Sequence, residues 1–247
     1  MRNFVFFIKR IIKEVFFLIP KNDGFQEFHH FPFNHNVPLP NVAPFVMAQC
    51  CELLESIKVN YRITDGTILG LYRQGTFIPH DNDIDVDALD FHSIDLLHEG
   101  MKRHGMRLGR KVIYKKQLQQ LVYYNEDQVV FDIVFWHSEG NKIYNYSERG
   151  YERIQEKQFF ENLTYIEYKG RNYPMPSNIE KWLDMRFGQD WRIPKTYKRD
   201  WKEECGDIKK INYIMYRCIK YFQSAKKIKT KNRTIFHKPF LRLLRIF

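Results

Sequence analysis

The chain has 247 residues, of which 44% are hydrophobic, so it is long and apolar enough for one sizeable folded core and too apolar to be globally disordered. Its 40 Lys and Arg residues exceed its 29 Asp and Glu residues, and the resulting charge of +11 favours an anionic partner: a nucleotide, a lipid surface, an acidic polymer or a nucleic acid. The four cysteines form no CxxC pair and have no zinc-finger spacing to histidine. We therefore expect neither a disulfide framework nor a structural zinc site. We expect a reduced, cytoplasmic setting.

The two ends of the chain are amphipathic in pattern. Residues 1–20 are rich in Phe and Ile, but four charged residues interrupt the run, so it is too polar to span a membrane and suits a helix lying in a membrane interface. Residues 226–247 alternate basic and apolar side chains. Both ends could hold the protein at an anionic inner membrane surface; a helix docked on the protein body and a solvated basic tail are the alternatives.

Between these ends, the sequence alternates helical and extended patterns. We expect helices over residues 46–58, 91–104, 177–187 and 207–223, the third with Ser177 as N-cap. We expect strands over residues 60–64, 81–89 and 106–112, and hairpins that join 120–124 to 128–136 and 163–168 to 172–175. The pattern predicts three parts. Residues 1–45 hold the N-terminal amphipathic helix and a Pro- and His-rich connection, residues 46–225 form one α/β domain, and residues 226–247 form a basic amphipathic tail.

The most informative segment is residues 80–87, HDNDIDVD. In an extended chain the carboxylates of Asp81, Asp83, Asp85 and Asp87 share one face, while the intervening apolar side chains turn to the core. Adjacent carboxylates repel one another unless cations neutralise them, and hard oxygen ligands suit Mg²⁺ or Mn²⁺. An EF-hand loop is excluded because it would need Gly and Glu at positions that hold other residues here. A solvated acidic edge strand remains the alternative.

A second extended stretch, residues 129–135 (VVFDIVF), places Asp132 in an otherwise apolar run. A buried carboxylate without a partner is costly, so Asp132 should accept hydrogen bonds, face a cavity or help to hold a metal. Alone, it would be as consistent with a structural role. Together with the carboxylates of residues 81–85, it completes a set that could hold one or two metals for an in-line phosphoryl displacement.

Upstream, Asp65, Gly66 and Thr67 follow an expected strand and begin a helical turn. Backbone N–H groups and a hydroxyl at such a turn are a favourable place for phosphate oxygens, although a Gly-Thr pair is a weak signal by itself. Arg73 lies between this turn and the acidic segment, where its guanidinium could neutralise phosphate charge.

These segments together resemble the LicD family, which includes bacterial phosphocholine transferases and the fukutin-related proteins. The family pattern is roughly D-G-T-L-L-G-x-x-R followed by F-I-P-W-D-D-D-I-D, and this chain has DGTILGLYR at 65–73 and FIPHDNDID at 77–85. The resemblance extends to residues 131–133 (FDI) and to an aromatic C-terminal signature over residues 173–191. Two departures are His80, where Trp is usual, and Asn82, where a further Asp is common.

The resemblance implies a nucleotidyltransferase-like mixed sheet flanked by helices, a Mg²⁺ or Mn²⁺ cofactor, and transfer of a phosphocholine-like group from a CDP-alcohol to a cell-surface glycan with release of CMP. By position, it implies Asp83 and Asp85 as principal metal ligands with Asp81 and Asp132 in support, and it implies Asp83, Asp85 and Asp132 as catalytic residues. It implies Gly66 and Thr67 at the phosphate and Arg73 near the donor.

Two other functions share part of this pattern. A nucleotidyltransferase proper would use the same carboxylates to attach a nucleoside monophosphate to a small molecule or protein, and would release pyrophosphate. A basic nucleic-acid-binding protein would exploit the charge of +11. No nucleic-acid-binding motif supports the last function and the acidic segment opposes it, so we expect no nucleic-acid partner.

Overall fold

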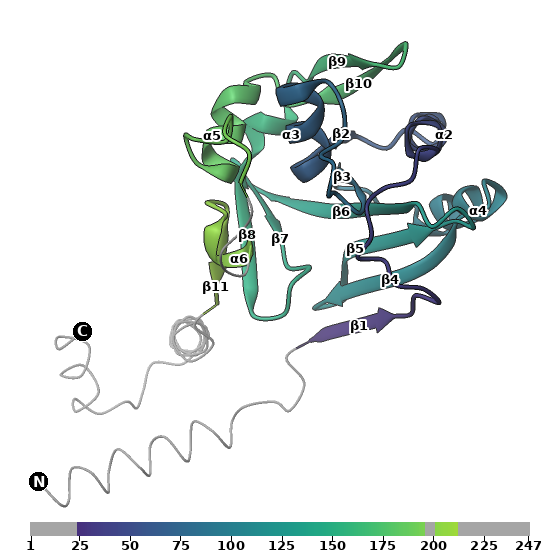
Figure 1. The fold of residues 1–247 in the computed structure, drawn as a ribbon. Coiled ribbons are helices and arrows are strands. Elements are labelled where there is room, and N and C mark those ends of the chain that lie inside the picture. The colour runs from purple at the N-terminus through teal and green to yellow at the C-terminus, as the bar shows by residue number, and fades with distance from the viewer. Residues whose placement is uncertain (1–23, 196–200, 212–247) are drawn as a thin grey trace, which may run out of the picture. The chain divides into compact units, whose positions relative to one another are not determined.

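The computed structural model describes residues 24–195 and 201–211 (Figure 1). The predicted helix within residues 1–20, the basic tail over 226–247 and residues 212–223 of the last predicted helix lie outside this part of the chain. Contacts divide the chain into two compact units, residues 1–209 and 210–247, and the site lies in the first. Within the described residues, no helix is long and apolar enough to cross a membrane.

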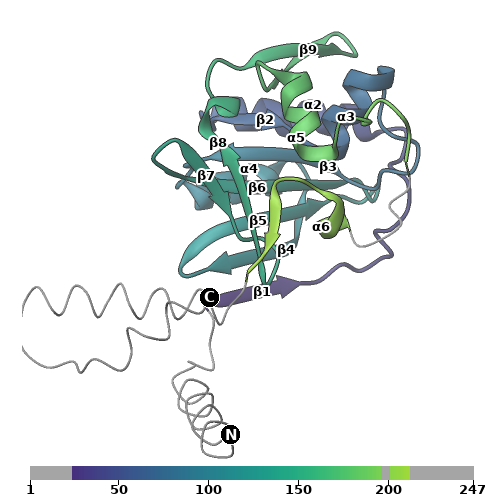
Figure 2. The same cartoon turned by 90° about the vertical axis from the view of Figure 1, so that its left-hand side faces the viewer.

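A mixed sheet of nine strands forms the centre of the first unit. Its strands are β1 (Phe25–His29), β2 (Tyr61–Ile63), β3 (Ile84–Leu89), β4 (Arg107–Tyr114), β5 (Gln117–Tyr124), β6 (Val130–Glu139), β7 (Lys142–Asn145), β8 (Tyr151–Glu156) and β11 (Ile208–Lys210). The main path runs β1-β4-β5-β6-β7-β8-β11, and β3 joins β6 as a parallel neighbour that also pairs with β2. Figure 2 shows β11 beside β8.

Helices and a separate hairpin surround this sheet. They are α2 (Ala43–Ser56), α3 (Asp65–Gln74), α4 (Ile94–Arg103), α5 (Ile179–Phe187), the short α6 (Trp201–Glu204), a 3-10 turn η1 (Lys157–Phe160), and the pair β9 (Thr164–Tyr168) and β10 (Arg171–Met175). The main core packs α2 and α4 against the sheet, with Met47 and Leu97 fully buried. Burial of such side chains is the principal stabilisation of the fold.

The two faces of the sheet differ in chemistry. On β3 and β6, Ile84, Val86 and Ile133 face the core, and the residues that alternate with them face the other way. Strand register places Arg110, Val122, Asp132 and Asp85 in one row across β4, β5, β6 and β3. The row shares the face opposite the core, so the sheet carries acidic and basic side chains on its second face.

The expected α/β class, with a mixed sheet flanked by helices, is confirmed. The helices predicted at 46–58, 91–104 and 177–187 are present with shifted ends, and the N-cap of α5 is Asn178, one residue after the predicted Ser177. Both predicted hairpins are present.

Three local predictions are wrong. The predicted connection begins with strand β1, which pairs with β4 and extends the sheet. The strand predicted over residues 81–89 is β3, which begins at Ile84 rather than at Asp81, so the first half of the acidic segment is a loop. Residues 208–210 form β11 rather than the start of a helix, because the Asp207 carbonyl accepts the N–H of Ile154 and aligns the segment with β8.

Candidate metal and phosphate site

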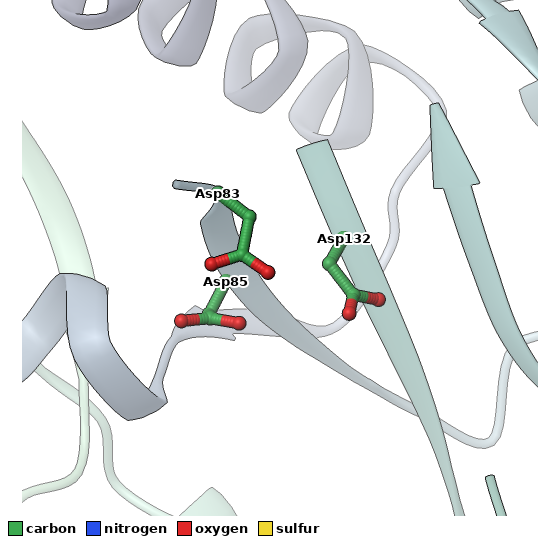
Figure 3. Close-up of side chains that lie close together, drawn as sticks. All are labelled: Asp83, Asp85 and Asp132. Atoms are coloured by element: carbon green, nitrogen blue, oxygen red, sulfur yellow. The ribbon is translucent and has the colours of Figure 1, made fainter. Parts of the chain in front are cut away.

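Three aspartates meet at the ends of adjacent strands. Asp83, Asp85 and Asp132 each offer a carboxylate oxygen, and these oxygens lie within 4.8 Å of one another. Figure 3 shows the three carboxylates gathered on one side of β3 and β6. Asp85 and Asp132 are direct partners in the parallel pair, and Asp83 precedes β3 by one residue. Three hard oxygen donors at this spacing are a suitable ligand set for Mg²⁺ or Mn²⁺.

Asp81 lies at the edge of this group, on the loop before β3. Its side chain packs against Gly66, where an added Cβ would lie 2.4 Å from the Asp81 Oδ2. The Asp81 backbone carbonyl accepts the N–H of Leu39, which fixes the loop. Among the described residues, the buried Asp81 Oδ2 has no hydrogen-bond partner. Asp81 is therefore available as a supporting ligand, although it is not one of the three clustered carboxylates.

The electrostatics of the four carboxylates match their crowding. Burial, followed by repulsion from neighbouring aspartates, raises the pKa of Asp83 and of Asp85 well above its usual value. Burial raises the pKa of Asp81 to about 7, and that of Asp132 to about 7 although Arg110 and Gln120 oppose the rise. Four crowded, buried carboxylates with raised pKa values favour binding of a neutralising cation or of protons.

Asp87 departs from the predicted row of four equivalent carboxylates. It shares the face of Asp85, but it is fully buried and pairs with Arg62, its cross-strand partner on β2, at 2.9 Å. The Arg62 guanidinium also donates to the Phe159 carbonyl and to Gln155. Asp87 is thus neutralised by the protein itself and belongs to the structural support of the site.

The predicted phosphate turn contacts Asp85 directly. The backbone N–H of Gly66 donates to Asp85 Oδ2 at 3.1 Å, and the buried Thr67 hydroxyl accepts the N–H of Asp85 at 2.8 Å. These contacts hold Asp85 in place, a role that the sequence did not indicate. Binding of phosphate by Gly66 and Thr67 stays a prediction.

Arg73 lines a cavity that the three clustered aspartates also line. One guanidinium nitrogen donates to the Trp191 carbonyl at 3.2 Å, and the buried Nε has no hydrogen-bond partner within the described part of the chain. The guanidinium is therefore incompletely satisfied by the protein. Its contact with a donor phosphate stays a prediction.

A buried ionic network beside the cavity was not foreseen from the sequence. Asp65 accepts from Arg186 at 2.7 Å and pairs with Arg153 at 3.2 Å, and both arginines also pair with Asp207. Asp65 has φ 45°, a left-handed conformation that Asp tolerates better than most residues. The network fixes the start of α3 and hence Gly66. The only sequence signal was Asp65 itself, because its partners come from distant elements.

These groups surround one cavity of about 600 Å³. The carboxylate cluster lies in its wall together with four arginines, Arg73, Arg110, Arg153 and Arg186. The last three are already paired with carboxylates of the protein. Trp191, Ile193 and Pro194 add apolar wall, and His80 and Lys195 also line the cavity. A cavity with clustered carboxylates and guanidinium groups can hold a divalent cation and the phosphates of a nucleotide together.

The mixed sheet, with aspartates paired on neighbouring strands beside this cavity, has the arrangement that the sequence predicted for a nucleotidyltransferase-like fold. Residues 58–178 match the family described as LicD/FKTN/FKRP, nucleotidyltransferase domain. This match confirms the resemblance to the LicD family seen in the motifs.

Curated relatives agree with this assignment. Over 162 residues, the chain is 27% identical to a ribitol-5-phosphate transferase FKTN of Macaca fascicularis, a match that covers 64% of this chain and 34% of the relative. The human FKTN is 26% identical over the same shares. The chain spans about a third of the length of these relatives. Among solved structures, the lincomycin-bound lincosamide adenylyltransferase LnuA is similar, with 17% identity, a TM-score of 0.43, and coverage of 63% of this chain and 95% of that chain.

Proposed function

We propose that this protein is a metal-dependent phosphotransferase that moves a phospho-alcohol group from a CDP-activated donor to a hydroxyl of a cell-surface glycan, and releases CMP. The observation that carries the proposal is the cluster of Asp83, Asp85 and Asp132 in the wall of a cavity that four arginines also line. The LicD-family match over residues 58–178 supports it.

The residues present fit a Mg²⁺ or Mn²⁺ ion. The donor set consists of carboxylate oxygens, which these hard cations prefer, and Asp132 Oδ1 and Asp81 Oδ2 are buried without a hydrogen-bond partner among the described residues. Asp83, Asp85 and Asp132 would hold the ion, with Asp81 in support. When bound, the ion supplies charge neutralisation at the donor phosphates.

The protein's own groups then have defined tasks. Gly66 and Thr67 hold Asp85 through two hydrogen bonds, and the buried network at Asp65 fixes the helix that carries them. Arg73 offers a guanidinium to the donor phosphates. The acceptor hydroxyl oxygen attacks the phosphorus that bears the alcohol, the bond from that phosphorus to the bridging oxygen of CMP breaks, and a site carboxylate accepts the hydroxyl proton.

The alcohol has two candidates. The motif resemblance favours a phosphocholine-like group, and the names of the FKTN relatives favour ribitol 5-phosphate. The cavity wall contains Phe187, Trp191 and Trp201, aromatic groups of the kind that recognise a quaternary ammonium, as well as polar side chains suited to a polyol. Both donors therefore belong in the test.

A second candidate reaction is nucleotidyl transfer to a small molecule or protein, which the description of the matching domain favours. The same carboxylates would serve. The product separates the two reactions, because phospho-alcohol transfer from a CDP-alcohol releases CMP whereas nucleotidyl transfer from CTP releases pyrophosphate.

We also propose that the protein works at the inner face of the cell membrane through its basic amphipathic ends. Co-sedimentation of the full chain with vesicles containing anionic phosphatidylglycerol should exceed that with neutral phosphatidylcholine vesicles, and should weaken with salt. Equal recovery with both vesicles would contradict this placement.

The decisive assay for the reaction incubates the purified chain with Mg²⁺, extracted cell-surface glycan, and CDP-choline, CDP-ribitol, CDP-glycerol or CTP, and identifies products by mass spectrometry. We expect CMP and a phospho-alcohol adduct on the glycan with one CDP-alcohol, both lost with Asp83→Ala. Pyrophosphate from CTP would support nucleotidyl transfer instead. Absence of metal-dependent turnover with every donor would refute both reactions.

A further inference from the structure

Gln120 is a polar residue of the site that neither the motifs nor the proposed reaction uses. It lies on β5, and its Cα partner on β6 is Val134, two residues beyond Asp132. Gln120 is only 5% exposed and lines the cavity on the same face as the carboxylates. Its side-chain amide Nε2 donates to Asp132 Oδ2 at 2.6 Å. Gln120 is thus a diagonal cross-strand neighbour of a predicted metal ligand.

Two of the four polar side-chain atoms of Gln120 and Asp132 take part in this hydrogen bond, and two do not. Gln120 Nε2 and Asp132 Oδ2 satisfy each other. Gln120 Oε1 and Asp132 Oδ1 are buried, and neither has a hydrogen-bond partner in the described residues. Buried acceptors without partners are uncommon in native proteins because each forfeits its hydration, so two beside one cavity point to hydrogen-bond or metal partners that bind there.

The sheet leaves little freedom in this arrangement. Asp132 is held on the central strand β6, between β5 and β3, and its register with Asp85 fixes where its side chain begins. Rotations about the Cα–Cβ and Cβ–Cγ bonds of Asp132 are the remaining freedom. The hydrogen bond that Gln120 donates restrains both rotations, since it engages Oδ2, while Oδ1 has no hydrogen-bond partner among the described residues.

We propose that Gln120 is a positioning residue of the metal site: it occupies one oxygen of Asp132 so that the other is presented to the divalent cation, and its Oε1 accepts a hydrogen bond from an O–H group bound in the cavity. This inference rests on the proposed metal-dependent function. Hydrogen-bond partners of metal ligands commonly set ligand orientation, and their loss weakens metal affinity about 10- to 100-fold.

The adjacent residue provides a matched control. Gln119 is fully buried on the same strand, at the register shift between β4 and β5, but it is not among the residues that line the cavity. Its Oε1 accepts the N–H of Tyr146, and its Nε2 donates to the Gln117 carbonyl. Replacing either glutamine with Met removes a buried amide at nearly constant length. Only the change at residue 120 removes a partner of Asp132.

The test measures binding of Mn²⁺ alone to the full chain, by titration calorimetry or by the free-ion electron paramagnetic resonance signal. We expect Gln120→Met to weaken Mn²⁺ binding by about tenfold or more, and Gln119→Met to lower thermal stability while it leaves Mn²⁺ affinity unchanged. Gln120→Asn, which keeps an amide but is one methylene too short to reach Asp132, should weaken binding similarly and covers the case in which the Met variant does not fold.

Wild-type Mn²⁺ affinity in folded Gln120→Met or Gln120→Asn would overturn the inference. Asp83→Asn separates this failure from failure of the metal site. If Asp83→Asn loses binding while the Gln120 variants retain it, the metal site stands and the role of Gln120 is refuted. If the wild-type chain itself binds no Mn²⁺, the metal site and the inference both fail.

Discussion

Asp85 and Asp132 are direct partners across the parallel strands β3 and β6, and both side chains face away from the core. Neighbouring strands lie about 4.8 Å apart, so two like charges in this position repel each other. Asp83 adds a third carboxylate to the pair. The fold therefore holds three carboxylates in mutual repulsion, which a divalent cation would relieve.

Removal of one clustered carboxylate should stabilise the metal-free protein. Asp83→Asn lowers the repulsion within the cluster, so we expect a higher thermal midpoint than wild type in EDTA, and a smaller rise on addition of Mg²⁺. Differential scanning calorimetry with and without Mg²⁺ measures both. A lower midpoint in EDTA would contradict the crowding of carboxylates seen here.

Asp87→Asn, four residues further along the acidic segment, is the matched comparison, and we expect it to lower stability where Asp83→Asn raises it. This change leaves the Arg62 guanidinium buried without its charged partner. Breaking a buried pair from one side costs about 3–5 kcal/mol. Urea unfolding should show this loss, with or without Mg²⁺.

Stability of the metal-free protein should depend on pH in a specific direction. Burial raises the pKa of Asp81 and Asp132 to about 7, above the value of about 3.9 expected in the unfolded chain. Between these values the folded state binds more protons, so the free energy of unfolding should fall as pH rises from about 4 to 7. Saturating Mg²⁺ should flatten this decline. A metal-free stability that rises over the same range would refute the shifts.

Gly66→Ala should affect the site more than the fold. Its Cβ would lie 2.4 Å from Asp81 Oδ2, so the Asp81 carboxylate must move. If Asp81 supports the metal, Mn²⁺ affinity should fall about tenfold with little change in thermal midpoint. Gly70→Ala, on the same helix, would instead meet the Thr76 carbonyl oxygen at 2.7 Å and should mainly lower the midpoint. Equal effects of the two changes on affinity and midpoint would contradict this assignment.

Asp65→Asn tests the buried network through charge alone, because Asn also tolerates the left-handed backbone at φ 45°. Burial raises the pKa of Asp65, but Arg153 and Arg186 outweigh this effect and hold it below its usual value. Loss of the charge leaves two buried arginines less well compensated, so we expect a loss of about 3–5 kcal/mol in urea unfolding at pH 7. In wild type the contribution of Asp65 should fade as pH drops below about 4, since the carboxylate must then take up a proton.

Much of the site was predictable because its residues lie close together in sequence. Alternation along the acidic segment correctly placed Asp85 opposite Ile84 and Val86. As expected for a lone carboxylate in an apolar strand, Asp132 accepts a hydrogen bond and lines a cavity. Sequence alone could not show that Asp87 forms an ion pair with Arg62, because that pair depends on the register of β2 with β3.

The missed features share one physical cause, long-range pairing. Arg153 and Arg186 reach Asp65 from 88 and 121 residues away. Strand β11 forms because residues 207–210 run along β8, although their local composition favours a helix. Gln120 carried no signal because glutamine in a strand is ordinary until its diagonal neighbour is known to be Asp132.

The most direct test of the central claim follows the two phosphates of the donor separately. The wild-type chain is given Mg²⁺, acceptor glycan and the CDP-alcohol identified in the donor assay, labelled with ³²P either next to cytidine or next to the alcohol. We predict that the label next to the alcohol moves to the glycan while the label next to cytidine is released as CMP. Transfer of the cytidine-side label to the acceptor would contradict phospho-alcohol transfer and establish nucleotidyl transfer in its place.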